Sequence, residues 1–138
     1  MRKYILIGSG GFLGAILRYL IKEIQLNSLW ESIPINTLLI NVMGSFVLAL
    51  VLTATIEVSG FDEDIKVGAT VGFLGAFTTF STLCREIAEL LYQGYYFRAG
   101  LYLILSAAMG IAAAYLGMIT ARKVIIKMVN QSKKDKDT

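Results

Sequence analysis

Long runs of apolar residues, separated by short polar breaks, dominate the hydrophobic pattern of this chain. Each run is close to the roughly 20 residues that an α-helix needs to cross the hydrocarbon core of a bilayer. The pattern predicts four transmembrane helices, at residues 4–24, 33–56, 66–92 and 98–122. A single four-helix membrane domain over residues 1–129 then accounts for nearly the whole chain, and residues 130–138 form a solvated, loosely ordered tail.

The third apolar run contains a polar, glycine-rich patch, Gly-Phe-Leu-Gly-Ala-Phe-Thr-Thr-Phe-Ser-Thr at residues 72–82. Polar groups at membrane depth are tolerated only where they meet protein, water or an ion. Gly72 and Gly75 precede Thr78-Thr79 and predict a point where the helix unwinds. Unwinding would free carbonyls that suit a hard cation and helix N-terminal amides that suit an anion. The alternative is an unbroken helix whose hydroxyls bond back to their own turn.

Composition supports a membrane protein and narrows its chemistry. The 138 residues are 56% hydrophobic and only 17% charged, with a single proline, whereas an average soluble domain is about a quarter charged. The chain has no histidine to relay protons or bind metal, and its one cysteine, Cys84, allows no internal disulfide. The net charge of +3 does not indicate a surface that binds nucleic acid. We therefore expect an all-helical integral membrane protein.

Four spans place both ends of the chain on the same side of the membrane. Met1-Arg2-Lys3 and the apolar run that follows resemble a secretory signal, but no small-residue cleavage site follows, so we expect a retained first span. Basic residues near the helix ends favour cytoplasmic termini only slightly. So weak a bias also fits a chain that inserts in both orientations.

Glycines recur in the first, third and fourth runs, including Gly10-x-x-x-Gly14 and Gly68-x-x-x-Gly72. Small residues let transmembrane helices approach closely, so we expect these glycines to be packing positions, with Gly75 as the exception. The glycines at residues 8–14 also resemble a nucleotide-binding loop. That motif needs a βαβ context, which the following apolar run does not provide, so we reject it.

Hydrogen-bond donors recur inside three of the four predicted spans. Thr37, Asn41 and Ser45 share one helix face, because they are spaced four residues apart. In the fourth span Tyr102 and Ser106 also share one face, and Gly110 extends this line without a side chain. The third span contributes Thr78, Thr79, Ser81 and Thr82, with Phe77 and Phe80 between them. Hydroxyls, amides and the positive edges of aromatic rings can all face an anion. As a set they predict a polar path, although any single hydroxyl can instead bond back to its own helix.

Acidic and basic side chains avoid the centres of the predicted spans. A proton-coupled exporter usually needs a carboxylate that it can protonate within the membrane, so the pattern favours a passive path. Arg18 is the deepest clear charge. Its side chain either reaches back to the membrane surface or lines a vestibule that attracts anions, and the sequence does not choose between these.

The chain resembles the Fluc (CrcB) fluoride channels. The resemblance covers nearly the whole chain and is carried by residues 10–19, 36–46 and 72–82, of which the last segment is the most specific. It implies a channel rather than an enzyme, built as an antiparallel, dual-topology homodimer in the plasma (inner) membrane, with two pores that export cytoplasmic fluoride. It also implies a broken third helix and a structural Na⁺ at the centre of the dimer, held by the backbone carbonyls of Gly75 and Thr78.

The resemblance also assigns residues to the fluoride pore. These are Asn41, Phe80, Tyr102, Ser106, Ser81, Thr82 and Arg18, and Glu86 matches a polar position close to the pore. Two positions depart from the common family pattern. Leu83 replaces a phenylalanine, and Gly110 replaces a serine of the polar track, so we expect conduction with an altered rate or ion occupancy.

Two other functions compete with the fluoride channel. A small dual-topology, proton-coupled multidrug exporter also has four helices per subunit, but it needs a glutamate within the first span, and Glu23 lies at the end of that span. A non-transporting scaffold that assembles partners through its glycine faces is the second competitor.

Overall fold

Helices make up nearly all of the computed structural model, which describes residues 1–24, 34–57 and 61–134. The elements are α1 (Arg2–Glu23), α2 (Ile35–Glu57), α3 (Glu63–Val67), the π-helix η2 (Gly68–Leu74), α4 (Gly75–Phe77), α5 (Phe80–Tyr92) and α6 (Tyr96–Lys134). Within these residues four stretches are long and apolar enough to cross a membrane: α1, α2, Glu63–Tyr92 and Tyr96–Ile125. The predicted all-helical fold with four spans is confirmed, and residue 33 of the predicted second span lies outside the described residues.

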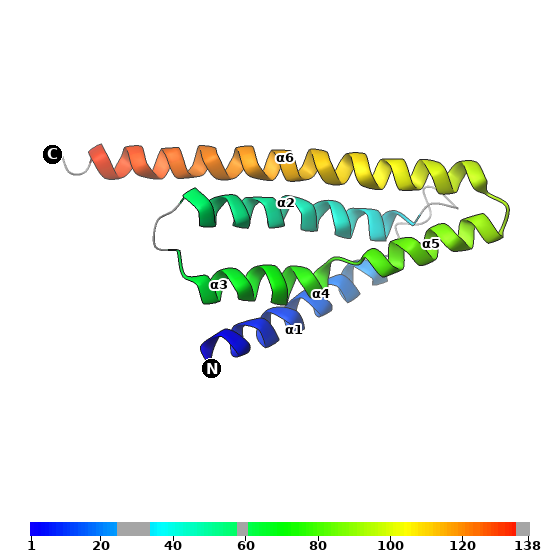
Figure 1. Ribbon diagram of the computed structural model, residues 1–138, viewed down its shortest axis with the longest axis horizontal. Coiled ribbons are helices and arrows are strands. Elements are labelled where there is room, and N and C mark those ends of the chain that lie inside the picture. Colours follow the sequence, from blue (N-terminus) through cyan, green and yellow to red (C-terminus); the bar gives the residue numbers. More distant parts are fainter. Residues whose placement is uncertain (25–33, 58–60, 135–138) are drawn as a thin grey trace.

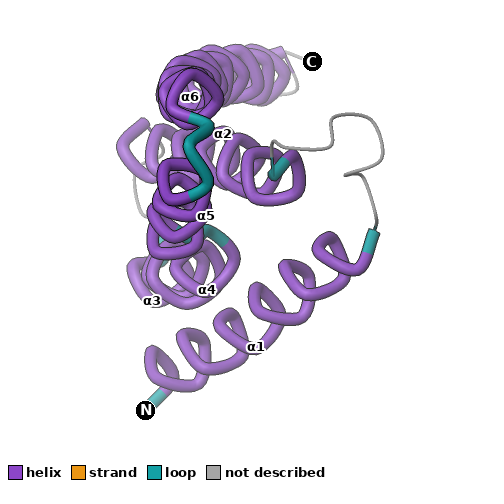
Figure 2. Tube along the Cα trace, turned by 90° about the vertical axis from the view of Figure 1, so that its right-hand side faces the viewer, coloured by secondary structure: helices purple, strands orange, loops and turns teal. Residues whose placement is uncertain are grey.

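The helices associate mainly as two pairs (Figure 1). α2 lies along α6, and α1 lies along the α3–η2–α4 segment, with η2 making the most extensive contact to α1. Seen end-on, α1 crosses the remaining helices at an angle (Figure 2). The beginning of α1 and the end of α6 point to the same end of the molecule, as an even number of spans requires.

Glycines allow α1 and η2 to approach each other closely. A Cβ atom added to Gly10 would lie 2.5 Å from the carbonyl oxygen of Gly68, and one added to Gly72 would lie 2.6 Å from that of Ile7. At Gly14 an added Cβ would collide with the backbone of Phe73. These glycines are packing positions, as predicted, because no larger residue fits between the two backbones.

α6 continues well past the predicted end of the fourth span. It has 39 residues, so it is about 58 Å long at 1.5 Å per residue, more than the roughly 40–45 Å of a bilayer with its headgroups. Residues 130–134 of the predicted tail belong to this helix, and residues 135–138 lie outside the described part of the chain. Helical residues continue past Arg122 because no proline or glycine interrupts the segment that follows it.

Two ion pairs join neighbouring elements at the end of the molecule that carries both termini. Arg122 Nε lies 2.8 Å from Glu57 Oε1, and Arg2 lies 2.7 Å from Asp62. Asp62 also begins α3 by accepting hydrogen bonds from the backbone of residues 64 and 65. The hydrogen bond from the Ile65 amide is the main reason why the pKa of Asp62 lies below its ordinary value.

Large apolar side chains cover much of the outer surface. Tyr4, Phe12, Ile104 and Ile111 are among those more than half exposed. Among the described residues the buried core is small, and most of it forms two clusters, one around Tyr102 in the α5–α6 contact and one around Phe77 and Ile40. Such a surface suits lipid or a second subunit, because neither leaves apolar groups in water.

We predict that Gly14→Ala destabilises the fold by about 1–3 kcal/mol, the usual cost of forcing extra atoms into a packed contact. Thermal unfolding of the purified protein in detergent measures the effect. Gly8→Ala is the matched control, because an added Cβ there meets nothing within 4 Å. Equal melting temperatures for the two variants would contradict the close contact between α1 and η2.

Candidate functional site

The third span is broken at Thr78 and Thr79. Their backbone angles are extended, with φ/ψ of −78°/158° and −150°/113°, between the end of α4 at Phe77 and the start of α5 at Phe80. The predicted break is confirmed, and it lies at the two threonines rather than at the glycines before them. Gly72 and Gly75 remain helical, since Gly72 serves the contact with α1, whereas the two β-branched threonines adopt the extended conformation that such residues favour.

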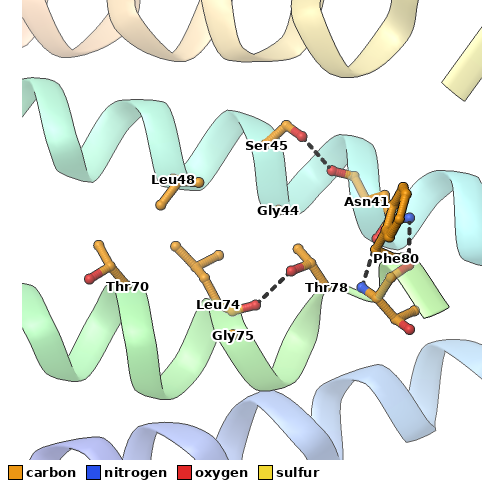
Figure 3. Close-up of a pocket in the computed structure, with 10 residues that line it drawn as sticks. Asn41, Gly44, Ser45, Leu48, Thr70, Leu74, Gly75, Thr78 and Phe80 are labelled. Carbon is orange, nitrogen blue, oxygen red and sulfur yellow. Dashed lines mark hydrogen bonds between the residues drawn. The ribbon is translucent and has the colours of Figure 1, made fainter. Parts of the chain in front are cut away.

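Asn41 on α2 binds the backbone at this break. Its side-chain oxygen accepts a hydrogen bond from the Thr79 amide at 2.9 Å, and its Nδ2 donates to the Thr79 carbonyl at 3.1 Å. Figure 3 shows the Asn41 side chain reaching from α2 to the end of the broken segment. One side chain thereby satisfies both backbone groups that Thr79 would otherwise pair within a helix.

A cavity of about 340 Å³ lies between α2 and the broken third span (Figure 3). Its lining residues are Asn41, Gly44, Ser45, Leu48, Thr70, Leu74, Gly75, Thr78, Thr79 and Phe80. The fold thus brings together the predicted pore residues Asn41 and Phe80 and the predicted cation-binding residues Gly75 and Thr78. The Phe80 side chain is 77% exposed within the single chain, so its ring is open to a partner or a ligand.

A second polar cluster lies where α2, α5 and α6 meet. The Glu86 carboxylate accepts hydrogen bonds from the Thr37 hydroxyl at 2.8 Å and from the Tyr102 hydroxyl at 2.9 Å. Thr37 and Tyr102 are both fully buried. The sequence placed Tyr102 on the polar track and Glu86 close to the pore, but it did not reveal that Thr37 and Tyr102 share this carboxylate.

α2 and α6 run in the same direction with a constant register (Figure 1). Tyr102 and Thr37 both bind Glu86, and Arg122 forms an ion pair with Glu57. In each of these pairs the residue on α6 follows the residue on α2 by the same number of positions in the sequence. The same spacing separates Gly110 from Ser45, whose hydroxyl oxygen would lie 3.6 Å from a Cβ atom added to Gly110. The residues spaced four apart on α2 therefore face the residues spaced four apart on α6. These equal spacings are the sequence feature from which the pairing of the two helices could have been predicted.

Ser106 lies level with Asn41 in this register. Its hydroxyl oxygen is buried and has no hydrogen-bond partner within the described part of the chain. A buried hydroxyl without a partner is uncommon and costs free energy, and the proton of Ser106 stays available for donation.

The remaining predicted pore residues are less closely connected to the cavity. The Thr79 hydroxyl donates to Thr82 Oγ1 at 2.9 Å and lies 3.4 Å from Ser81 Oγ, so both residues border the break. Arg18 is half-buried on α1 and makes no ion pair or hydrogen bond to the residues that the structure describes. Leu83 points into the core, where it packs in one cluster with Tyr102, so the departure at this position fills space within the subunit.

The chemistry of the site is that of hydrogen-bond donors and backbone carbonyls. Among the described residues, no cluster of three or more histidine, cysteine, aspartate or glutamate side chains is placed to hold a metal ion. Amide and hydroxyl donors suit an anion, and carbonyl oxygens suit a hard cation.

Comparison with known proteins identifies the family. Residues 5–118 match the family model described as "CrcB-like protein, Camphor Resistance (CrcB)". The fluoride-specific ion channel FluC of Prosthecochloris aestuarii is 41% identical over 118 residues, 86% of this chain and 91% of that protein. FluC of Shewanella denitrificans is 39% identical over 85% of this chain and 94% of its own length, and FluC 1 of Methanosarcina acetivorans is 38% identical over 88% and 92%. The chain belongs to the CrcB (FluC) family.

Proposed function

We propose that this protein is a fluoride-selective channel that lets toxic cytoplasmic fluoride leave the cell passively across the plasma membrane. The observation that carries the proposal is a donor-lined cavity at the break of a transmembrane helix, in a chain that aligns over most of its length with fluoride-specific channels. A channel of this kind is not an enzyme, and its substrate is the ion itself.

The donors of the site suit fluoride for a physical reason. Fluoride is small and strongly hydrated, so several aligned donors must replace its water at once. The Asn41 amide keeps one N–H beyond the hydrogen bond to Thr79, and the Ser106 hydroxyl has no partner among the described residues. The exposed Phe80 ring presents a positive edge. Chloride is larger and fits poorly into a narrow, rigid set of donors. Selectivity for fluoride over chloride therefore follows from the width of the pore and the placement of its donors.

A second copy of the chain, inserted antiparallel, would complete the pore. Four helices enclose little space, and the cavity is bordered by the exposed residues Gly75 and Phe80. A partner seated there would cover the Phe80 ring and give each pore a wall from each subunit. The nearly balanced basic residues at the two ends of the spans agree with insertion in both orientations.

A structural Na⁺ at the centre of this dimer would be held by the backbone carbonyls of Gly75 and Thr78. α4 ends at Phe77, so its last carbonyls lack helical partners, and the Thr79 amide that would serve the Gly75 carbonyl is bonded to Asn41 instead. Both residues line the cavity. Hard cations prefer such oxygen ligands, and a bound cation would neutralise the carbonyl dipoles at the dimer centre.

The competing functions receive less support. Glu23 is the exposed last residue of α1, so the first span offers no buried carboxylate for the coupling of drug export to protons. A scaffold gives no role to the Ser106 hydroxyl, which is buried without a partner among the described residues.

Fluoride release from reconstituted vesicles tests the proposed function. Vesicles loaded with potassium fluoride and containing the purified protein should release fluoride to an electrode when an ionophore supplies the counter-charge. Protein-free vesicles are the control. Release at the rate of the protein-free vesicles would overturn the assignment.

We predict that Phe80→Ile abolishes fluoride efflux while the protein stays folded, because isoleucine has no ring edge to face the anion. Phe12→Ile is the matched control, since Phe12 is 67% exposed on α1 and borders no part of the cavity. Gel filtration reports on folding and the fluoride electrode on efflux. Wild-type efflux in Phe80→Ile would remove this ring from the pore.

We predict that Asn41→Asp also abolishes efflux. The carboxylate has no N–H for the Thr79 carbonyl or for fluoride, and its charge repels the anion. Asn36→Asp is the control, because Asn36 Nδ2 donates to carbonyls at the end of α1, including Ile24 at 2.8 Å, outside the cavity. Efflux is compared per folded protein. Asn41→Asp protein that conducts at the wild-type rate would exclude the asparagine from the path.

We predict that exchange of Na⁺ for a large organic cation lowers both the melting temperature and the fluoride efflux of the purified protein, and that returned Na⁺ restores both. The carbonyls of Gly75 and Thr78 lose their counter-charge when the ion leaves. Thermal unfolding and efflux measured in parallel check this. Identical values with and without Na⁺ would contradict a bound cation.

A further inference from the structure

Ser45 on α2 faces Gly110 on α6. A Cβ atom added to Gly110 would lie 3.6 Å from the Ser45 hydroxyl oxygen and would meet no other atom within 4 Å. This is an ordinary van der Waals distance, so the glycine is not required for close packing here. Gly117, one step further along the same interface, differs, because an added Cβ there would collide with the backbone of Phe46. Gly110 therefore leaves a small unfilled space beside a hydroxyl.

Ser45 also borders the candidate pore. Ser45 lines the cavity together with Asn41 and Phe80, and its hydroxyl donates to the Asn41 carbonyl at 2.8 Å. Figure 3 shows this hydroxyl on the side of α2 that faces α6. A serine hydroxyl can rotate about its C–O bond, so its proton can turn from the carbonyl to a ligand without movement of the helix.

Donors from both helices continue along this interface at regular intervals. Tyr102 lies level with Thr37, Ser106 with Asn41, and Gly110 with Ser45, each one helical turn beyond the previous pair. The buried Ser106 hydroxyl lacks a partner in the described residues. The pair Ser45–Gly110 is thus the next position at which a desolvated anion leaving Ser106 and Asn41 would need a donor.

We propose that Ser45 contacts the permeating fluoride ion and that Gly110 provides the space for the ion beside it. This inference rests on the proposed channel function and extends the path by one turn of α2. The ion exchanges its last contacts at Ser106 and Asn41 for the Ser45 hydroxyl, while the Asn41 carbonyl gives up one hydrogen bond. Either helix could supply the hydroxyl, because Ser45 and a side chain at residue 110 would share the same space.

Ser45→Ala tests the role of the hydroxyl. Loss of one hydrogen bond to an anion should lower fluoride efflux about tenfold, while gel filtration and melting temperature stay at wild-type values. Ser9→Ala is the matched control, since the exposed Ser9 hydroxyl makes the same kind of bond, to the Ile5 carbonyl at 2.8 Å, away from the cavity. Equal efflux in Ser45→Ala and wild-type protein would overturn the proposal.

Rescue from the opposite helix separates ion binding from a structural role. Gly110→Ser in the Ser45→Ala background returns a hydroxyl to the same space and should restore most of the efflux, whereas Gly110→Ala in that background should not. If both double variants conduct equally, a hydroxyl is not what the ion requires, and the proposal fails. Wild-type efflux above that of protein-free vesicles is the reference in every comparison, so a failure here is distinct from a failure of the channel assignment.

Discussion

The two hydrogen bonds between the Asn41 side chain and the Thr79 backbone are the interaction on which the rest of the site depends. Within a membrane, each unsatisfied backbone group costs several kcal/mol, so a transmembrane helix breaks only where something replaces its internal bonds. Asn41 replaces both bonds of Thr79 from a neighbouring helix. The break then turns α5 away from α4, exposes Phe80 beside the cavity and leaves the carbonyls at the end of α4 without helical partners.

The packing around this break explains why it is held in one position. α1 lies against η2 through glycines that bring the two backbones into contact, and α2 is paired with α6 in a constant parallel register. Gly44 of α2 faces Thr78 and Phe77 so closely that an added side chain would collide with Thr78. Asn41, almost one turn before Gly44, and Ser45, directly after it, both border the cavity. The same register places the donors of α6 opposite those of α2.

Local patterns in the sequence predicted much of this arrangement. Apolar runs predicted the four spans and glycine spacing the packing faces, whereas the polar patch left the third helix either broken or unbroken, and the family resemblance implied the break. The position of the break was less predictable, because glycine suggests both flexibility and close packing, and Gly72 serves packing here. The pairing of Asn41 with Thr79, and of Glu86 with Thr37 and Tyr102, joins residues far apart in the chain. No local pattern specifies such contacts, although the matching four-residue spacings on α2 and α6 contained the signal for their register.

The central claim is that fixed donors replace the hydration shell of a small halide within this fold. The most direct measurement is the release of fluoride and of chloride from the same reconstituted vesicles, loaded with both ions at equal concentration. Donor replacement in a narrow path predicts fast fluoride release and chloride release no faster than from vesicles without protein. Release of both ions at comparable rates would indicate a wide, water-filled path and would contradict this account.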